Sequence, residues 1–144
     1  MRLYAMALIS GLYAAMASAE PAPTFRVVDP DQLLYRSEPR TPGAGIARVA
    51  GDPQQGPYTI RARFEPGATT PPHSHPDERV VTVLSGRYLL AAGSRFDAAA
   101  LQAYGPGTVL IVPAGLVHFS AAGSSKTVVQ ESGVGPTAFL PAAP

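Results

Sequence analysis

Two glycine-bounded segments hold every histidine of this chain and constrain its fold more than any other feature. Residues 67–86 contain His73 and His75, and residues 107–118 end on His118. The whole sequence has 144 residues and three histidines. Both segments combine short apolar runs with glycine and proline, which is typical of short strands joined by tight turns. We therefore expect the three histidines to serve one common site.

The composition favours a single all-β domain. Hydrophobic residues make up 46% of the chain and charged residues 15%, as in a globular protein. Glycine and proline are frequent, at 14 and 16 residues, so the chain should turn often. About eight or nine short strands with regularly spaced turn signals indicate a sandwich or a barrel.

The charge and the lack of cysteine exclude several classes of function. The formal net charge is +1, from 11 basic and 10 acidic residues. No strongly basic field is available for a nucleic acid or for anionic lipid. The absence of cysteine excludes disulfides, thiolate nucleophiles and thiolate metal ligands.

Residues 1–19 have the features of a secretory signal peptide. Arg2 supplies the positive start, residues 3–16 are mainly apolar, and the small residues 17–19 permit cleavage after Ala19. The alternative is a membrane anchor, but the apolar run is shorter than the ~20 residues that span a bilayer. The sequence thus predicts a secreted or periplasmic protein that leaves the membrane after cleavage.

The rest of the chain divides into residues 20–45, an N-terminal arm, and residues 46–144, the barrel domain. Residues 30–36 are predicted to be a loop or one helical turn, residues 85–86 a hairpin turn, and the alanine-rich residues 96–103 a short helix. The predicted strands are residues 25–28, 46–49, 58–64, 69–75, 80–84, 87–92, 108–112, 117–121 and 127–131, with a further pairing near 138–140.

The histidine spacing indicates a metal site. His73 and His75 lie two residues apart, so in an extended strand they project from the same face. His118 follows a Pro-x-Gly turn that can bring a neighbouring strand to the same place. Three neutral imidazoles suit Fe, Zn, Mn, Ni or Cu and leave coordination positions open.

The joint spacing resembles the two motifs of the cupin superfamily, G(x)5HxH(x)3,4E(x)6G and G(x)5PxG(x)2H(x)3N. The likeness extends over about residues 46–131 and looks like small single-domain bacterial cupins. It implies a double-stranded β-helix, that is, a jelly-roll barrel, with one divalent metal ion near its mouth and His73, His75 and His118 as ligands. The matching residues are Gly67, His73, His75 and Gly86 in the first motif and Gly107, Pro113, Gly115 and His118 in the second, with Ala122 in the place of the asparagine.

The sequence departs from the first motif at its carboxylate. Arg79 occupies the glutamate position, and Glu78 lies one residue early. A β-bulge near residues 80–81 would absorb the offset and make Glu78 the fourth ligand beside the three histidines. Alternatively, Arg79 points inward and Glu78 outward, which leaves either three-histidine binding or a site without metal.

The function suggested by the resemblance is that of a mononuclear metal-dependent enzyme, dioxygenase-like or isomerase-like, with no catalytic residue assigned. Its ligand should be a small, largely apolar or aromatic molecule, because the expected lining is apolar. A non-enzymatic binding or sensing module and a structural barrel with a degenerate site remain alternatives. The resemblance also implies a homodimer. The expected lining residues are Ile60, Phe64, Val81, Val83, Leu90 and Ile111.

Three further residues are candidate polar contributors to the site. They are Tyr88, Gln130 and Glu131, and all three fall on predicted strands. Their ordinary interpretation is that of exposed strand residues.

Overall fold

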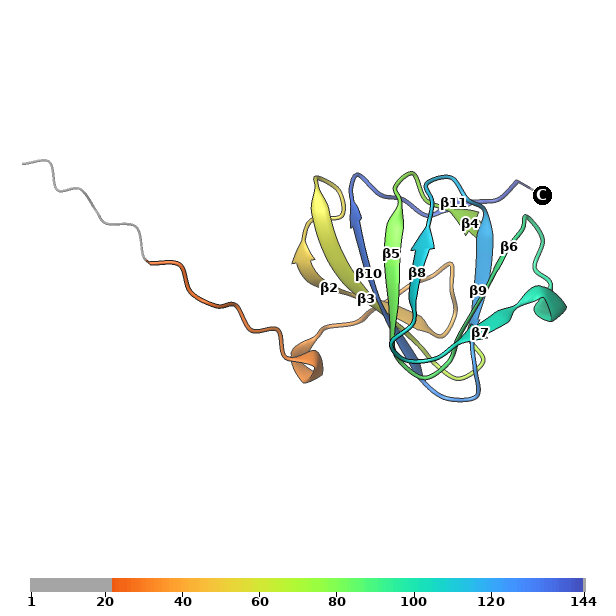
Figure 1. Cartoon of the computed structure of the whole chain (residues 1–144), viewed down its shortest axis with the longest axis horizontal. Helices are drawn as coiled ribbons and strands as arrows, with labels where there is room; N and C mark the ends of the chain where they lie inside the picture. Colours follow the sequence, from red (N-terminus) through yellow and green to blue (C-terminus); the bar gives the residue numbers. More distant parts are fainter. Residues whose placement is uncertain (1–21, 144) are drawn as a thin grey trace, which may run out of the picture.

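The computed structural model describes residues 22–143, which form a barrel of two facing antiparallel sheets (Figure 1). One sheet has six strands in the order β1-β2-β3-β10-β5-β8, and the other has five in the order β11-β4-β9-β6-β7. The elements are η1 (Pro30–Gln32), β1 (Arg36–Ser37), β2 (Ala44–Gly51), β3 (Pro57–Phe64), β4 (Thr69–Ser74), β5 (Arg79–Ser85), β6 (Tyr88–Ala92), η2 (Ala98–Ala100), β7 (Gln102–Tyr104), β8 (Val109–Val112), β9 (His118–Ala122), β10 (Thr127–Val134) and β11 (Leu140–Pro141).

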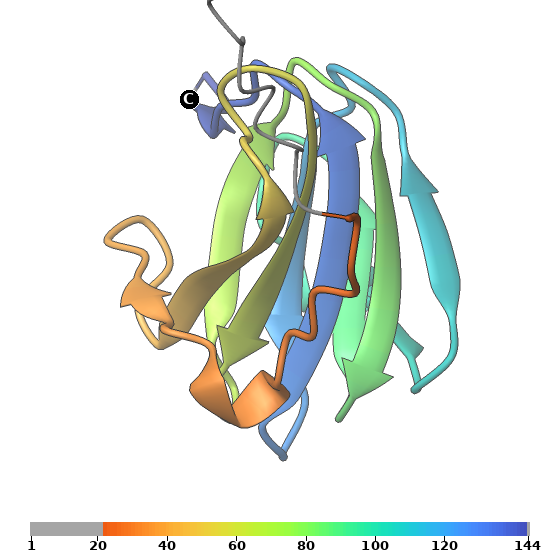
Figure 2. The same ribbon diagram turned by 90° about the vertical axis from the view of Figure 1, so that its left-hand side faces the viewer.

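The core lies between the two sheets, which face each other in Figure 2. In β3, alternate residues are buried, because a strand with one face on a core repeats every two residues. β10 lies at the centre of the six-stranded sheet, between β3 and β5, and Val129 on it is fully buried. The all-β jelly-roll prediction is confirmed.

The turn at residues 85–86 connects the two sheets. β5 pairs with β8 and β10, whereas β6 pairs with β7 and β9, so the predicted hairpin is wrong. Gly86 has a φ of 75°. A Cβ on it would lie 2.5 Å from the carbonyl oxygen of Lys126 and from the hydroxyl of Thr127. Only glycine fits this crossing, where the chain passes close to the start of β10.

β8 is less buried than its apolar sequence predicts. Val109 is 56% exposed and Ile111 65% exposed, whereas Val112 faces the core. β8 is the edge strand of the six-stranded sheet, and alternation turns every second side chain outward. Ile111 is therefore not a lining residue, in contrast to our expectation. Of the other predicted lining residues, Ile60, Phe64, Val81 and Val83 are buried, and Leu90 packs against the core.

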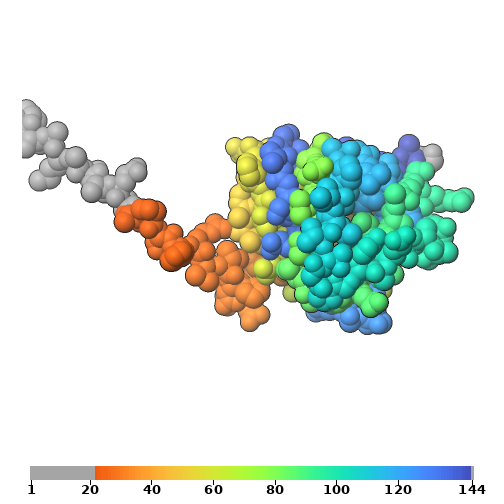
Figure 3. All heavy atoms as spheres, in the orientation of Figure 1, coloured from red at the N-terminus to blue at the C-terminus, as the bar shows by residue number. Residues whose placement is uncertain are grey.

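The N-terminal arm projects from the barrel over its first residues (Figures 1 and 3). Residues 25–28 are not a strand, and the side chain of Phe25 is 97% exposed. One 3₁₀ turn, η1, follows, and β1 then pairs with β2. The predicted signal peptide, residues 1–19, lies outside the described residues. No helix within residues 22–143 is both long enough and apolar enough to cross a membrane.

The predicted helix at residues 96–103 is a single 3₁₀ turn, η2. The Asp97 side chain accepts a hydrogen bond from the backbone of Ala99 at 2.9 Å and caps this turn. The chain then enters β7, which pairs with β6. Backbone pairing with the sheet replaces the helix that the alanine content favours.

The C-terminal segment returns across one end of the barrel. β11 pairs with β4, and Leu140 lies opposite Ser74 in the register. The predicted pairing near residues 138–140 is confirmed. It brings Ala138 and Phe139 to the histidine-bearing strand.

Candidate metal centre

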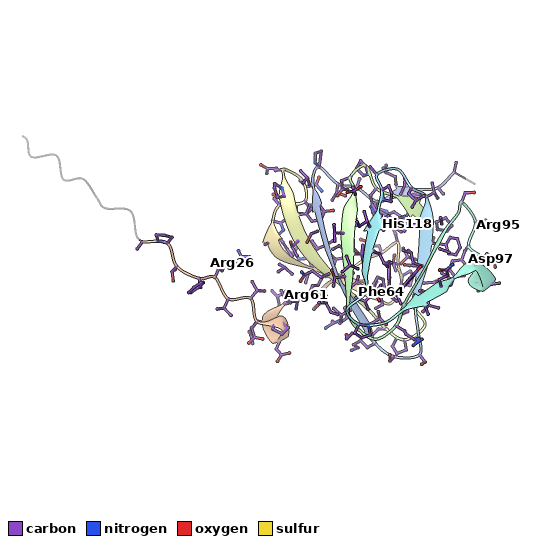
Figure 4. The ribbon with its side chains drawn as sticks, viewed as in Figure 1. Arg26, Arg61, Phe64, Arg95, Asp97 and His118 are labelled. Carbon is purple, nitrogen blue, oxygen red and sulfur yellow. The ribbon has the colours of Figure 1, made fainter. Side chains whose placement is uncertain are left out.

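His73, His75 and His118 form one buried cluster. One ring nitrogen of each lies within 4.8 Å of the others. His73 on β4 is the direct partner of His118 on β9, and His75 follows the end of β4. Figure 4 shows His118 inside the barrel. The sequence-based expectation that the two motifs meet at one place is correct.

A bulge in β4 sets the direction of His73. The pairing with β9 shifts between Thr70 and His73, so β4 has one extra residue at Pro71 and Pro72. Proline cannot donate a hydrogen bond to the neighbouring strand and is commonly found at such irregularities. The bulge changes the alternation, so that Thr70, His73 and His75 all face inward.

Backbone carbonyls fix the tautomer of all three rings. The Nδ1 atom of His73 lies 2.8 Å from the oxygen of Pro71, that of His75 lies 2.7 Å from Ala138, and that of His118 lies 2.9 Å from Leu116. A carbonyl only accepts, so each Nδ1 donates its proton and each Nε2 presents a lone pair. Histidine ligands of metals are commonly oriented in this way.

The Nε2 atoms converge without a proton between them. Those of His73 and His75 are 3.1 Å apart. Burial lowers the pKa of His73 to about 3 and that of His75 to about 4, and it also lowers the pKa of His118. All three rings are therefore neutral at neutral pH. Lone pairs that face one another at this distance repel unless a cation lies between them, so the donor set fits a metal ion.

Glu78 is not part of this cluster. Its side chain is exposed and lines an open hollow on the outer side of β5, together with Val80 and Ser132. The register of β5 with β8 is regular from Arg79 to Thr82, so alternation sends Glu78 outward and Arg79 inward. The only β5 irregularity opposite β10 lies between Val83 and Ser85. The predicted bulge near residues 80–81 is absent from the register of residues 79–82, and the structure does not bring Glu78 to the three histidines.

Arg79 is buried beside the cluster, with 8% of its surface exposed. Its Nη1 donates to Glu131 at 2.6 Å and its Nη2 donates to the hydroxyl of Thr137 at 2.8 Å. Its Nε lies 3.8 Å from Asp77. Two carboxylates thus compensate one guanidinium, which is the condition for burying such a charge.

Asp77 extends this network away from the cavity. It accepts hydrogen bonds from the hydroxyl of Tyr58 at 2.5 Å and from the hydroxyl of Thr137. Burial and the bond to Asp77 raise the pKa of Tyr58 to about 12. Gly133 is required beside them, because a Cβ there would lie 2.5 Å from Asp77 Oδ2. Asp77 and Thr137 were not among the site residues predicted from the sequence.

Of the three candidate polar contributors, two face inward. Glu131 and Tyr88 are buried and line the histidine cavity, whereas Gln130 bonds Arg61 at 3.2 Å on the other face of the sheet. The ordinary interpretation of exposed strand residues is therefore wrong for Glu131 and Tyr88. The alternation of residues in β10 could have predicted that Glu131 faces inward, because Glu131 shares the inner face of the strand with Thr127 and Val129.

The cavity beside the histidines has a volume of about 510 Å³. One wall is apolar and includes Ile60, Phe64 and Val112. The ring of Phe139 stacks on His73 with 4.1 Å between centroids and 3° between planes. Arg40 of the arm lies 5.4 Å above the Phe139 ring. The cavity thus offers apolar and aromatic surface next to a few polar groups, as small-molecule sites do.

Comparison with protein families places this chain in the cupin superfamily. Residues 60–129 match the family Cupin_2, described as the cupin domain. The match covers both histidine motifs. The chain is a cupin-superfamily protein. A comparison with curated protein sequences gives no match.

Solved structures with the same fold include several cupins and enzymes. The polyketide cyclase RemF from Streptomyces resistomycificus has a TM-score of 0.70 and 18% identity, covering 84% of this chain and 87% of its own. An RmlC-like cupin from Shewanella frigidimarina has a TM-score of 0.61 and 13% identity, covering 77% and 91%. An oxalate oxidase has a TM-score of 0.55 and 21% identity, covering 75% and 58%. At these identities the likeness supports the fold alone.

Proposed function

We propose that this protein is an exported, mononuclear metal-dependent cupin enzyme that acts on a small, largely apolar or aromatic molecule. The observation that carries the proposal is the convergence of three neutral imidazoles, each with its lone pair on Nε2, in a buried cavity. Fe, Zn, Mn, Ni and Cu all suit such donors.

The residues of the cavity support this chemistry. A divalent ion held by His73, His75 and His118 would supply Lewis-acid chemistry at a ligand oxygen or activation of dioxygen. The apolar wall would bind the carbon skeleton of the ligand, and Phe139 would limit the access of water. Dioxygenase-like and isomerase-like reactions both fit these roles.

Binding or sensing without turnover is the second candidate. It is favoured by Arg79, which replaces the carboxylate of the family motif with a buried cation. A structural barrel with a degenerate site would have the same arginine, but it would not need three histidines with matched tautomers.

The decisive experiment measures metal in the mature protein, purified without chelator. The wild type should carry about one ion per chain, and the double variant His73→Ala/His118→Ala should carry none. Equal metal content in both proteins would overturn the proposal.

Turnover is tested on the metal-loaded protein with panels of phenolic and enediol compounds. Oxygen uptake would identify dioxygenase-like activity, and product analysis without oxygen uptake would identify isomerisation. Tight retention of a compound with neither change would favour the binding module.

The proposed export and a homodimer are tested separately. Sequencing of the mature N-terminus should begin at Glu20, and an uncleaved Met1 would contradict secretion through a signal peptide. Light scattering of the mature chain should give twice the monomer mass if the homodimer forms.

A further inference from the structure

Glu131 is the buried carboxylate of the histidine cavity, which the half-buried Glu38 also lines. It lies on β10, in the six-stranded sheet, and 9% of its surface is exposed. It lines the same cavity as His73, His75 and His118. β10 is not part of either histidine motif, so this carboxylate comes from a different strand than the glutamate of the family motif.

The carboxylate of Glu131 points into the barrel. Glu131 shares the buried inner face of β10 with Thr127 and Val129, whereas the residues between them are less buried. Side chains on this face point from the six-stranded sheet toward the sheet that bears the histidines.

The two oxygens of Glu131 have different surroundings. Oε2 accepts the 2.6 Å hydrogen bond from Arg79. Oε1 accepts no hydrogen bond from residues 22–143, and Glu131 lines the histidine cavity.

Arg79 holds Glu131 at a fixed place. The guanidinium is bound at its other nitrogen by Thr137 and lies beside Asp77, so it cannot follow a movement of the carboxylate. The metal-ligating cluster, whose atoms lie within 4.8 Å of one another, contains the three histidines and not Glu131. The carboxylate is thus near the cluster without being a member of it.

We propose that Glu131 is the carboxylate that accepts a hydrogen bond from a ligand bound at the metal centre. Arg79 keeps Glu131 facing the cavity and prevents it from coordinating the ion. The inference rests on the proposed function. Arg79, which occupies the glutamate position of the first motif, is then a positioning residue for Glu131. The free oxygen of Glu131 is then available to a hydroxyl group of a ligand bound beside the histidines.

The first test is the affinity for Co²⁺ and Zn²⁺, measured on the chelator-treated, dialysed protein. Glu131→Gln keeps the shape of the side chain and removes its charge. We expect binding about 10-fold weaker than in the wild type, in the range seen when partners around a metal site are removed. The matched control, Glu78→Gln, removes the exposed carboxylate next to the motif's glutamate position and should change affinity less than twofold.

The second test frees the carboxylate. In Arg79→Met, Glu131 can turn to the ion, so Co²⁺ should bind about 10-fold more tightly and its visible spectrum should change with the added ligand. Removal of the positive charge alone would also raise affinity, so the double variant Arg79→Met/Glu131→Gln is required. It should show a smaller gain than Arg79→Met and no spectral change.

Three results would overturn the inference. They are wild-type affinity in Glu131→Gln, an effect of Glu78→Gln equal to that of Glu131→Gln, or an equal gain from Arg79→Met in both backgrounds. If Arg79→Met does not fold, as judged by circular dichroism, the comparison of the two glutamate variants still decides. A wild type that binds neither Co²⁺ nor Zn²⁺ would overturn the proposed function together with this inference, whereas normal binding that ignores Glu131 overturns the inference alone.

Discussion

Arg79 changes the chemistry of the site more than any other single residue. An arginine beside a metal centre needs compensation, because an isolated buried charge costs several kcal/mol. Glu131 and Asp77 provide it from β10 and from the turn before β5. The two carboxylates therefore compensate the charge of Arg79, and the three histidines form the candidate metal site.

Stability should depend on Asp77 and not on its neighbour Glu78. Asp77→Ala removes the acceptor of Tyr58 and Thr137 and one counter-charge of Arg79. We expect a loss of about 3 kcal/mol in the free energy of unfolding, measured in urea. Glu78→Ala, at an exposed position, should change it by less than about 0.5 kcal/mol. Similar losses in the two variants would contradict the buried network.

At the scale of elements, the β4–β9 pair positions the donors. The bulge at Pro71 and Pro72 places His73 opposite His118, and the turn before β9 is tied to β4 by the 2.8 Å bond from Gly115 N to His75 O. The pair therefore holds three neutral rings together in a buried place.

The metal-free protein should lose stability in mild acid. A histidine in the unfolded chain binds a proton near its ordinary pKa of 6.5, whereas folded His73 and His75 bind one only near pH 3 and pH 4. Between these values the unfolded state holds more protons, so the free energy of unfolding decreases as the pH falls from about 6.5 to about 4. Thermal unfolding in the presence of a chelator measures this. A melting temperature independent of pH in that window would contradict the buried neutral rings.

The edge strand β8 should tolerate change on its outer face. Ile111→Ala removes a side chain that is 65% exposed and should alter the free energy of unfolding by less than about 0.5 kcal/mol. Val83→Ala on β5 opens a cavity at a position that is 1% exposed and should cost about 2 kcal/mol. Urea denaturation compares the two variants. A larger loss of stability for Ile111→Ala would show that Ile111 lines the barrel core.

At the scale of the molecule, the ion should stabilise the whole barrel. A metal ion that binds only the folded state, at a free concentration 100 times its dissociation constant, adds about 2.7 kcal/mol to the free energy of unfolding. Addition of a chelator to the loaded protein should therefore lower the melting temperature. The double variant His73→Ala/His118→Ala should show no change with chelator, and an equal shift in both proteins would point to binding elsewhere.

Much of the barrel could be predicted from local sequence, and the errors share one cause. Alternation in residues 58–64 identified β3 and its buried face, and the glycine and proline residues located most turns. The errors at residues 85–86, at Ile111 and in residues 96–103 concern pairing. Whether a strand is central, at an edge or in the other sheet depends on strands distant in the chain.

The sequence by itself determined the fold class and the three donors, because turn residues and histidine spacing act over a few neighbouring positions. Only the tertiary structure decided the charge of the site. The direction of Arg79 depends on its register with β8, and its compensation by Glu131 depends on a strand about fifty residues further along the chain. A one-residue change of register reverses which side chains face the core, and local sequence does not specify that register.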